Sequence, residues 1–317
     1  MRKDKEHISF LNRERAKGFK KQGLPLDKNE RVIPFSDYVL DGLRIHLGKN
    51  IWKYPDIDSY YEIFANWLNV NEKNIFFTEG VSGAIRNIME LYVQKNVYYD
   101  MPTYAMYDVY RQIYNLELSS KENSDVIFLQ NPNIPYGTTY TEKEIRKICS
   151  ETTSIVALDD VYFGFNMPDY ISLINEYENL IIMRSFSKAF GLASIRLGYV
   201  ISNEKHINFL SNNRNGYETN LLSLQTAHYF IENEHFKNEY VNQVNDGRNY
   251  LINELKRLSV KYEGGHFGNF IFIHIDKALV SFFSEKGILV RKYDDGIRLT
   301  LGPKKEMEKF VAILKEI

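Results

Sequence analysis

The chain has 317 residues, 44% of them hydrophobic and 26% charged, which is typical of a globular protein with a large domain and a smaller one. Its net charge of −1 argues against a basic surface for nucleic acid or anionic membranes, and its single cysteine excludes an internal disulfide. The sequence contains neither a signal-peptide core nor an apolar run near the ~18 residues of a membrane span. We therefore expect a cytoplasmic protein without nucleic-acid or membrane partners.

Short apolar strands alternate with amphipathic helices over the first two thirds of the chain. Strands are expected at 74–77, 96–99, 125–130, 154–160, 179–185 and 197–202, with helices at 84–93 and 141–151. Continuous apolar strands between helices indicate a mostly parallel sheet that is covered on both faces. A helical stretch, 221–258, then precedes short strands and a last helix at 304–317. We predict a large domain, 37–232, and a smaller α+β domain built from 1–36 and 233–317.

Polar residues follow most of the predicted strands of this sheet. They are Gly80 and Ser82, Tyr104, Asn131 and Asn133, Asp159 and Asp160, and the run from Ser185 to Lys188. In open α/β sheets the ligand crevice lies at the carboxyl ends of the strands. The sequence therefore predicts one shared site at this edge of the sheet.

Lys188 lies in the segment RSFSKAFGLASIRLGY (184–199), directly after an apolar strand. An isolated lysine is most often a surface charge, whereas a lysine that attacks an aldehyde has to be desolvated or close to other cations. Ser185, Ser187 and Arg196 offer hydroxyl donors and a forked cation for a phosphate. Asp159 follows a different strand and can pair with a cationic ring nitrogen. A lysine, a phosphate cradle and an aspartate together indicate pyridoxal phosphate.

These segments resemble fold-type I pyridoxal-phosphate enzymes of the class I/II aminotransferases, and they are most similar to the histidinol-phosphate aminotransferase branch. The partial matches, in chain order, are NER (29–31), YPD (54–56), TEGVSGAI (78–85), MPTYAMY (101–107), NPNIPYG (131–137), LDDVYFGF (158–165), SFSKAFGLASIRLGY (185–199), GNF (268–270) and RLTLG (298–302). The resemblance implies an α/β fold with a mostly parallel central sheet, pyridoxal 5′-phosphate as the cofactor, and a homodimer with shared active sites.

The resemblance also implies a role for each matching residue. Lys188 would bond to the cofactor aldehyde and move the proton during catalysis. Asp159 would hold the pyridine nitrogen, Tyr162 would bind the phenolic oxygen, and Tyr104 would stack on the ring. The phosphate would be surrounded by Gly80, Val81, Ser82, Ser185, Ser187 and Arg196, with Tyr54 reaching it from the neighbouring subunit. Arg298 would bind the substrate carboxylate, and Arg291 would face the distal end of the substrate.

The chain departs from the family pattern at two places. Ile134 occupies the position of the asparagine that binds the phenolic oxygen in the family, so either Asn133 takes that role or Tyr162 acts alone. The segment NERVIPFSD (29–37) replaces the family's NENPxGPSP and changes the predicted lining of the substrate pocket. The substrate is therefore not carried over from the family.

We therefore predict a pyridoxal-phosphate-dependent aminotransferase that moves an amino group between an amino acid and a small, phosphorylated or polar keto compound. Glutamate is the expected amino donor. A decarboxylase of a phosphorylated amino acid, which uses the same cofactor, is the alternative. A cofactor-sensing regulatory domain is disfavoured by the short stretch before Tyr54 and by the near-neutral charge. The seven histidines show no ligand spacing, so we expect no metal site.

Overall fold

The structure, a computed structural model, describes residues 23–317 apart from 49, 215 and 277, and its strands form two sheets. The strands of the larger sheet are β2 (Ile75–Thr78), β3 (Asn96–Tyr99), β4 (Glu117–Leu118), β5 (Val126–Gln130), β6 (Ile155–Asp159), β7 (Leu180–Ser185) and β8 (Gly198–Ser202). In space they follow the order β2-β8-β7-β6-β5-β3-β4. The six strands predicted from apolar runs all belong to this sheet.

Strand β8 is antiparallel to both of its neighbours, whereas the strands from β7 to β4 are parallel to one another. A parallel connection needs a long crossover, usually an α-helix. The segment 186–197 between β7 and β8 contains only the short 3₁₀ helix η6 (Ala193–Ile195), so the chain turns back on itself. The predicted mostly parallel sheet is confirmed, with this one strand reversed.

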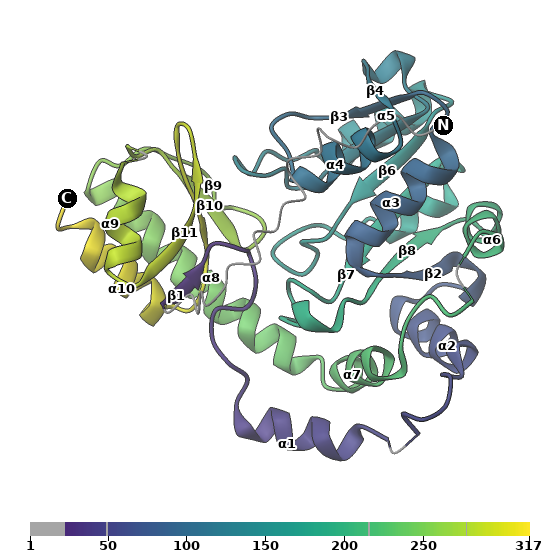
Figure 1. Cartoon of the computed structure of the whole chain (residues 1–317), viewed down its shortest axis with the longest axis horizontal. Helices are drawn as coiled ribbons and strands as arrows, with labels where there is room; N and C mark the ends of the chain where they lie inside the picture. Colours follow the sequence, from purple (N-terminus) through teal and green to yellow (C-terminus); the bar gives the residue numbers. More distant parts are fainter. Residues whose placement is uncertain (1–22, 49, 215, 277) are drawn as a thin grey trace.

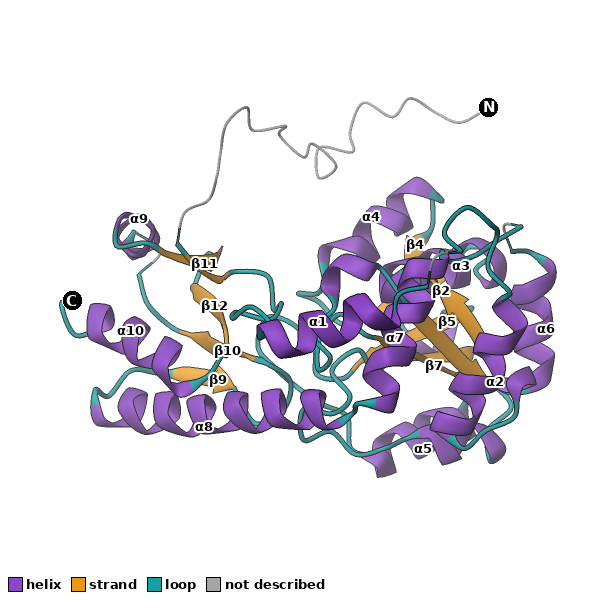
Figure 2. Ribbon diagram, turned by 90° about the horizontal axis from the view of Figure 1, so that it is seen from below, coloured by secondary structure: helices purple, strands orange, loops and turns teal. Residues whose placement is uncertain are grey.

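Helices cover both faces of the larger sheet (Figures 1 and 2). Successive side chains of a strand point to opposite faces, so Phe77 belongs to one core and Phe76 to another. The core around Phe77 includes side chains of α1 (Asp37–His46), α2 (Ile57–Leu68), α5 (Glu142–Glu151) and α7 (Leu221–Glu232). The core around Phe76 includes side chains of α3 (Gly80–Tyr92), α4 (Ala105–Ile113) and α6 (Glu204–Asn212). The predicted α/β class follows from this three-layer arrangement.

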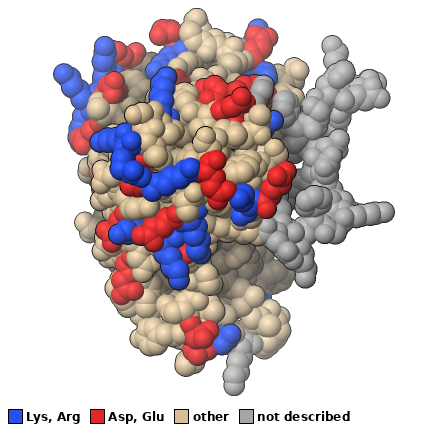
Figure 3. Space-filling model, turned by 90° about the vertical axis from the view of Figure 1, so that its left-hand side faces the viewer, with Lys and Arg blue, Asp and Glu red and all other residues tan. Residues whose placement is uncertain are grey.

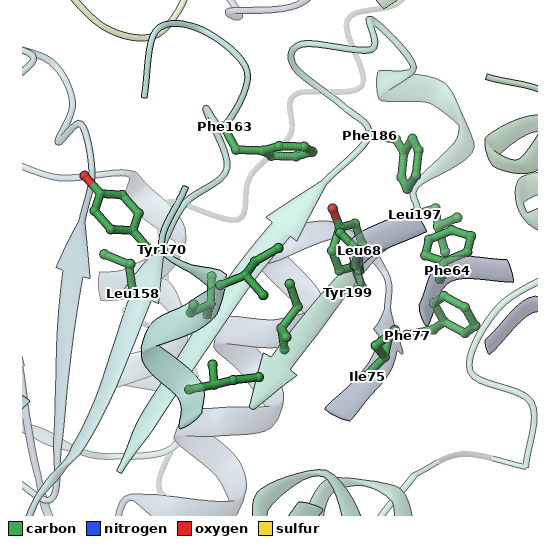
Figure 4. Packing of buried hydrophobic residues seen from close by; sticks show 14 of the residues in the cluster. Phe64, Leu68, Ile75, Phe77, Leu158, Phe163, Tyr170, Phe186, Leu197 and Tyr199 are labelled. Atoms are coloured by element: carbon green, nitrogen blue, oxygen red, sulfur yellow. The ribbon is translucent and has the colours of Figure 1, made fainter. Parts of the chain in front are cut away.

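Aromatic packing under the sheet holds the segment that carries Lys188. Figure 4 shows Phe186, Phe64, Phe77 and Tyr199 in the first core. Phe64 meets Phe77 at a ring-centroid distance of 4.8 Å and an interplanar angle of 84°, the edge-to-face arrangement that aromatic rings favour. Phe186 is fully buried. Burial of an aromatic side chain of this size contributes roughly 1.5–3 kcal/mol, so the loop after β7 is anchored close to Lys188.

The smaller sheet lies at the other end of the molecule (Figure 1). Its strands, in spatial order, are β1 (Leu24–Leu26), β11 (Ile288–Tyr293), β12 (Gly296–Thr300), β10 (Phe270–Ile273) and β9 (Tyr262–Gly264), and its helices are α8 (His235–Arg257), α9 (Leu279–Glu285) and α10 (Lys304–Leu314). β1 pairs with β11 in parallel, and the other pairs are antiparallel. The proposed domains, 37–232 and 1–36 with 233–317, remain a prediction, and residues 1–22 of it lie outside the described part.

The described part of the chain contains no helix that is both long and apolar enough to span a membrane. Figure 3 shows the face at the end of the smaller sheet, where Lys and Arg side chains are interspersed with Asp and Glu. Nucleic-acid binding uses a concentrated basic surface, and this face does not offer one.

Candidate active site

A cavity of about 610 Å³ lies at the carboxyl ends of the strands of the larger sheet and is also lined by residues of the smaller sheet. The predicted site residues that line it are Val81, Ser82, Tyr104, Asp159, Tyr162, Ser185, Ser187, Lys188, Arg196, Arg291 and Arg298. Gly80 lies next to the cavity, where it contacts Arg196. Tyr54 and Asn133 are not among the lining residues. The structure therefore brings together most of the predicted site. Asn133 lies between the lining residues Pro132 and Ile134, and Tyr54 was predicted to act in the neighbouring subunit's site.

The Lys188 amine is held by the backbone of the chain's amino-terminal part. Its Nζ donates to the carbonyl oxygens of Asn29 at 2.9 Å and Lys28 at 3.3 Å. Burial, reinforced by the charge of Arg298, lowers the pKa of Lys188 to about 8. At neutral to mildly alkaline pH, a useful fraction of this amine is therefore uncharged, as a lysine nucleophile requires.

Asp159 ends β6 with its carboxylate buried. The hydroxyl of Tyr107 donates to its Oδ2 at 2.8 Å, and the backbone N–H of Val161 donates to its Oδ1 at 3.2 Å. Burial raises the pKa of Asp159 to about 6, and these two donors oppose that rise. A cationic partner in the cavity would stabilise the ionised carboxylate further. Tyr107 was not predicted as part of the site, and no sequence signal connects it to Asp159.

Tyr162 is fixed by a residue from the amino-terminal segment. The side-chain amide of Asn29 donates to the Tyr162 hydroxyl at 2.8 Å, and the backbone N–H of Asn29 donates to the Thr300 hydroxyl at 2.9 Å. Burial raises the pKa of Tyr162 to about 12, so the phenol keeps its proton. Because its oxygen already accepts from Asn29, its own O–H is oriented elsewhere, and Tyr162 lines the cavity. Asn29 lies in the NER match, but the resemblance implied no individual role for it.

A cluster of hydrogen-bond donors lies at the start of α3. The Ser185 hydroxyl donates to Ser187 at 2.9 Å, and Arg196 extends toward Ser187, with Nη1 3.5 Å from its hydroxyl oxygen. Helix α3 begins at Gly80 without a side-chain cap, so its first backbone N–H groups have no helical partner. Gly80 has a φ of 68°, and a Cβ there would lie 2.9 Å from the Arg196 guanidinium. A helix N-terminus beside an arginine and two hydroxyls is a typical phosphate site.

Two arginines face the cavity from the smaller sheet. Arg291 on β11 is the direct cross-strand partner of Arg298 on β12, and both line the cavity. Like charges in directly opposite positions of a sheet destabilise it. Arg298 is buried, donates to the Asp27 carbonyl oxygen at 2.7 Å, and keeps its Nε without a partner. A buried, incompletely satisfied guanidinium beside a second arginine fits an anionic ligand.

The remaining predicted residues have distinct surroundings. Tyr104 lies at the cavity with its hydroxyl 3.2 Å from that of Ser82. Tyr54 is 76% exposed and stacks on Tyr217, with ring centroids 4.2 Å apart. Asn133 is buried with its Oδ1 unpaired, while Ile134 lines the cavity in place of the family asparagine. The sequence left open whether Asn133 binds the phenolic oxygen or Tyr162 acts alone. In the structure Asn133 does not line the cavity, and the Tyr162 hydroxyl accepts a hydrogen bond from Asn29.

These groups fit pyridoxal phosphate. The same cavity presents a partly neutral lysine, a buried carboxylate and a donor-rich anion site, which are the kinds of group that this cofactor needs. Arg298, whose Nε has no hydrogen-bond partner, offers a further cationic group to the substrate. Fold and site together define an enzyme that uses this cofactor.

Comparisons with known proteins identify the family. Residues 115–314 match the model for aminotransferase class I and II. The histidinol-phosphate aminotransferase of Caldanaerobacter subterraneus subsp. tengcongensis is 30% identical, with 98% of this chain and 99% of the relative aligned. That of Thermotoga neapolitana is 33% identical, with 94% of each aligned. The chain belongs to the class I and II aminotransferases and is a pyridoxal-phosphate-dependent aminotransferase.

Solved structures show the same fold at low sequence identity. A histidinol-phosphate aminotransferase from Sinorhizobium meliloti in complex with pyridoxal-5′-phosphate superposes with a TM-score of 0.83 at 20% identity, covering 93% of this chain and 90% of the other. An L-threonine-O-3-phosphate decarboxylase from Porphyromonas gingivalis gives a TM-score of 0.81 at 18% identity, covering 92% and 98%. The predicted fold type is confirmed, and because both activities occur on it, the fold alone does not choose between them.

Proposed function

We propose that the enzyme transfers the amino group of glutamate to a small phosphorylated ketone. The observation that carries this proposal is the cross-strand pair Arg291 and Arg298, which faces the same cavity as Lys188. One guanidinium suits the carboxylate of an amino donor, and the two together suit a dianionic phosphate. The relatives named histidinol-phosphate aminotransferase make histidinol phosphate the first amino compound to test.

When bound, pyridoxal phosphate supplies an aldehyde for the Lys188 amine and an electron-withdrawing ring that stabilises negative charge on the substrate's α-carbon. Lys188, with its lowered pKa, is suited to take the proton from that carbon and return it. Asp159 would hold the ring nitrogen in its protonated form. Ser185, Ser187 and Arg196 would hold the phosphate, and Arg298 would orient the substrate.

We propose that Asn29 compensates for Ile134. The family asparagine donates to the cofactor's phenolic oxygen, and Ile134 has no polar atom for that purpose. Asn29 instead donates to the Tyr162 hydroxyl at 2.8 Å, which orients the phenol so that its proton is free for the cofactor. In the family an asparagine donates directly to the cofactor's phenolic oxygen. In this chain Asn29 would instead act on that oxygen through the Tyr162 hydroxyl.

A homodimer also remains a proposal, supported by exposed apolar side chains near Tyr54. Ile45, Ile51 and Trp52 are at least 65% exposed, and Tyr54 is 76% exposed. Contiguous exposed apolar residues mark interaction sites, and in the proposed dimer Tyr54 would enter the neighbour's phosphate site. Sedimentation analysis tests the dimer, and weaker cofactor retention in Tyr54→Phe tests the shared site. Fractionation of cells tests the proposed cytoplasmic location.

The reaction is tested by adding glutamate alone to the holoenzyme. Transamination converts the cofactor to its amine form, with a spectral change and one 2-oxoglutarate released per site. Amino compounds with and without phosphate, including histidinol phosphate, are then compared as donors in the same assay. Carbon dioxide released from a phosphorylated amino acid, without 2-oxoglutarate from glutamate, would replace the aminotransferase proposal by the decarboxylase. Lys188→Ala is the inactive control.

A further inference from the structure

Helix α1 lies against α7 (Figure 1). Three potential metal ligands meet there, remote from Lys188 in the sequence and absent from the cavity lining. His46 ends α1, and His228 and Glu232 lie one turn apart on α7. Their ligand atoms all lie within 4.8 Å of one another. Among the described residues, this is the one group of three or more His, Cys, Asp or Glu side chains found so close together.

The distances are close to those of a coordination sphere. Nε2 of His228 lies 3.3 Å from Oε1 of Glu232, and Nδ1 of His46 lies 3.8 Å from its Oε2. Two ligand atoms on a tetrahedral Zn²⁺, each about 2.0–2.1 Å from the metal, are roughly 3.4 Å apart. Small rotations of the side chains would therefore close the site without movement of either helix.

The alternative to a metal site is a pair of ordinary ion pairs. His228 and Glu232 are spaced i and i+4, and such pairs are common on helix surfaces. A second histidine from another helix also approaches this carboxylate, with the two imidazole ring centroids 5.2 Å apart, so three ligand-type side chains from two helices converge at one place.

The ligand set also indicates which metal. Two imidazoles and one carboxylate, with water in the fourth position, are a common Zn²⁺ set. Hard cations such as Mg²⁺ and Ca²⁺ prefer oxygen ligands. The histidines are partly exposed and Glu232 is more than half exposed, so water can complete the sphere. We propose that His46, His228 and Glu232 bind one Zn²⁺ ion per chain.

The consequence concerns the segment that follows α1. His46 is the last residue of that helix, and the exposed Ile51, Trp52 and Tyr54 come within eight residues of it. A metal joining His46 to α7 would fix the end of α1 to the body of the large sheet. It would thereby restrict the segment that carries Tyr54 and that we assign to the dimer interface.

Equilibrium dialysis of the untagged holoenzyme against Zn²⁺ tests the proposal, with the visible absorption of bound Co²⁺ as a second readout. We expect one equivalent of metal per chain, a tetrahedral Co²⁺ spectrum, and a higher Tm with Zn²⁺. His228→Gln and Glu232→Gln should each weaken binding by more than about 100-fold, beyond the 10–100-fold of an outer-shell change. Glu232→Gln keeps the shape of a half-exposed side chain, so its folding is secure.

His266→Gln is the matched control, because His266 is an exposed histidine outside the cluster. It should bind Zn²⁺ as the wild type does. The proposal is overturned if the wild type binds less than one equivalent, if either cluster variant retains full affinity, or if the control loses it. Because the readout is metal content and not turnover, the result is independent of the proposed substrate.

Discussion

Replacing Lys188 by methionine in the cofactor-free protein should stabilise the fold at neutral pH. A lysine in an unfolded chain has a pKa near 10.5, whereas burial lowers that of Lys188 to about 8. Below pH 8 the folded state has to keep an ammonium ion in surroundings that disfavour it. This difference in pKa corresponds to about 3 kcal/mol at pH 7. Methionine has a similar length and no charge, so it removes this cost.

The pH dependence separates this effect from changes in packing. The unfolded state binds more protons than the folded state between pH 8 and 10.5, so the wild type becomes more stable as the pH rises through that window. At pH 9.5 about 1.4 kcal/mol of the cost remains, and the advantage of Lys188→Met should fall by about 2 kcal/mol from its value at pH 7. The lost contacts to the Lys28 and Asn29 carbonyls affect both pH values alike.

Urea denaturation of both cofactor-free proteins at pH 7.0 and 9.5 measures the difference. Lys147→Met, at an exposed position of α5, controls for the loss of one lysine. An advantage of Lys188→Met that is the same at both pH values would refute the lowered pKa. So would an advantage that grows with pH.

Three further predictions concern the site and its support. Arg298→Ala should raise the KM for the amino donor by about 10–100-fold, from the 1.5–3 kcal/mol of a charge-assisted hydrogen bond, whereas an equal loss of cofactor retention would make Arg298 structural. Asn29→Ala should lower kcat by roughly 3–10-fold and shift the pH profile, because a neutral hydrogen bond to Tyr162 is lost; an unchanged profile would remove Asn29 from the relay. Asp160→Ala should destabilise the fold by about 1.5–3 kcal/mol in urea denaturation, because the buried Arg184 loses the buried carboxylate 2.7 Å from it and keeps only the exposed Asp169 at 2.8 Å; a loss below 1 kcal/mol would contradict that.

Much of the fold follows from local patterns in the sequence. The strands predicted at 125–130 and 179–185 correspond to β5 and β7, whose residues are all buried. Thr141 and Glu144 form a capping box at the start of α5. The orientation of β8 was not predictable in the same way. An apolar run has no direction, and only the absence of a helix between residues 186 and 197 indicates the reversal.

Site residues that directly follow strands were predictable, whereas site residues that come from distant parts of the sequence were not. Asp159 ends a strand, and Lys188 and Arg196 lie in the loop after the neighbouring strand, so the order of the strands in the sheet brings all three to one cavity. Asn29 and Tyr107 reach the site through tertiary packing, so no spacing in the sequence connects them to Tyr162 or Asp159. The meeting of His46 with His228 depends on tertiary packing in the same way, which is why histidine spacing alone predicted no metal.

The three-residue strand β1 has a consequence for how activity is lost. Directly after it, residues 27–29 provide the carbonyls for Arg298 and Lys188 and the amide for Tyr162. Strand β1 lies at the edge of its sheet and pairs with β11 over three positions, and such short edge elements open locally at low free energy. Mild warming should therefore detach β1 and residues 27–29 first. Activity should be lost at a temperature at which the helices, followed by circular dichroism, are still intact.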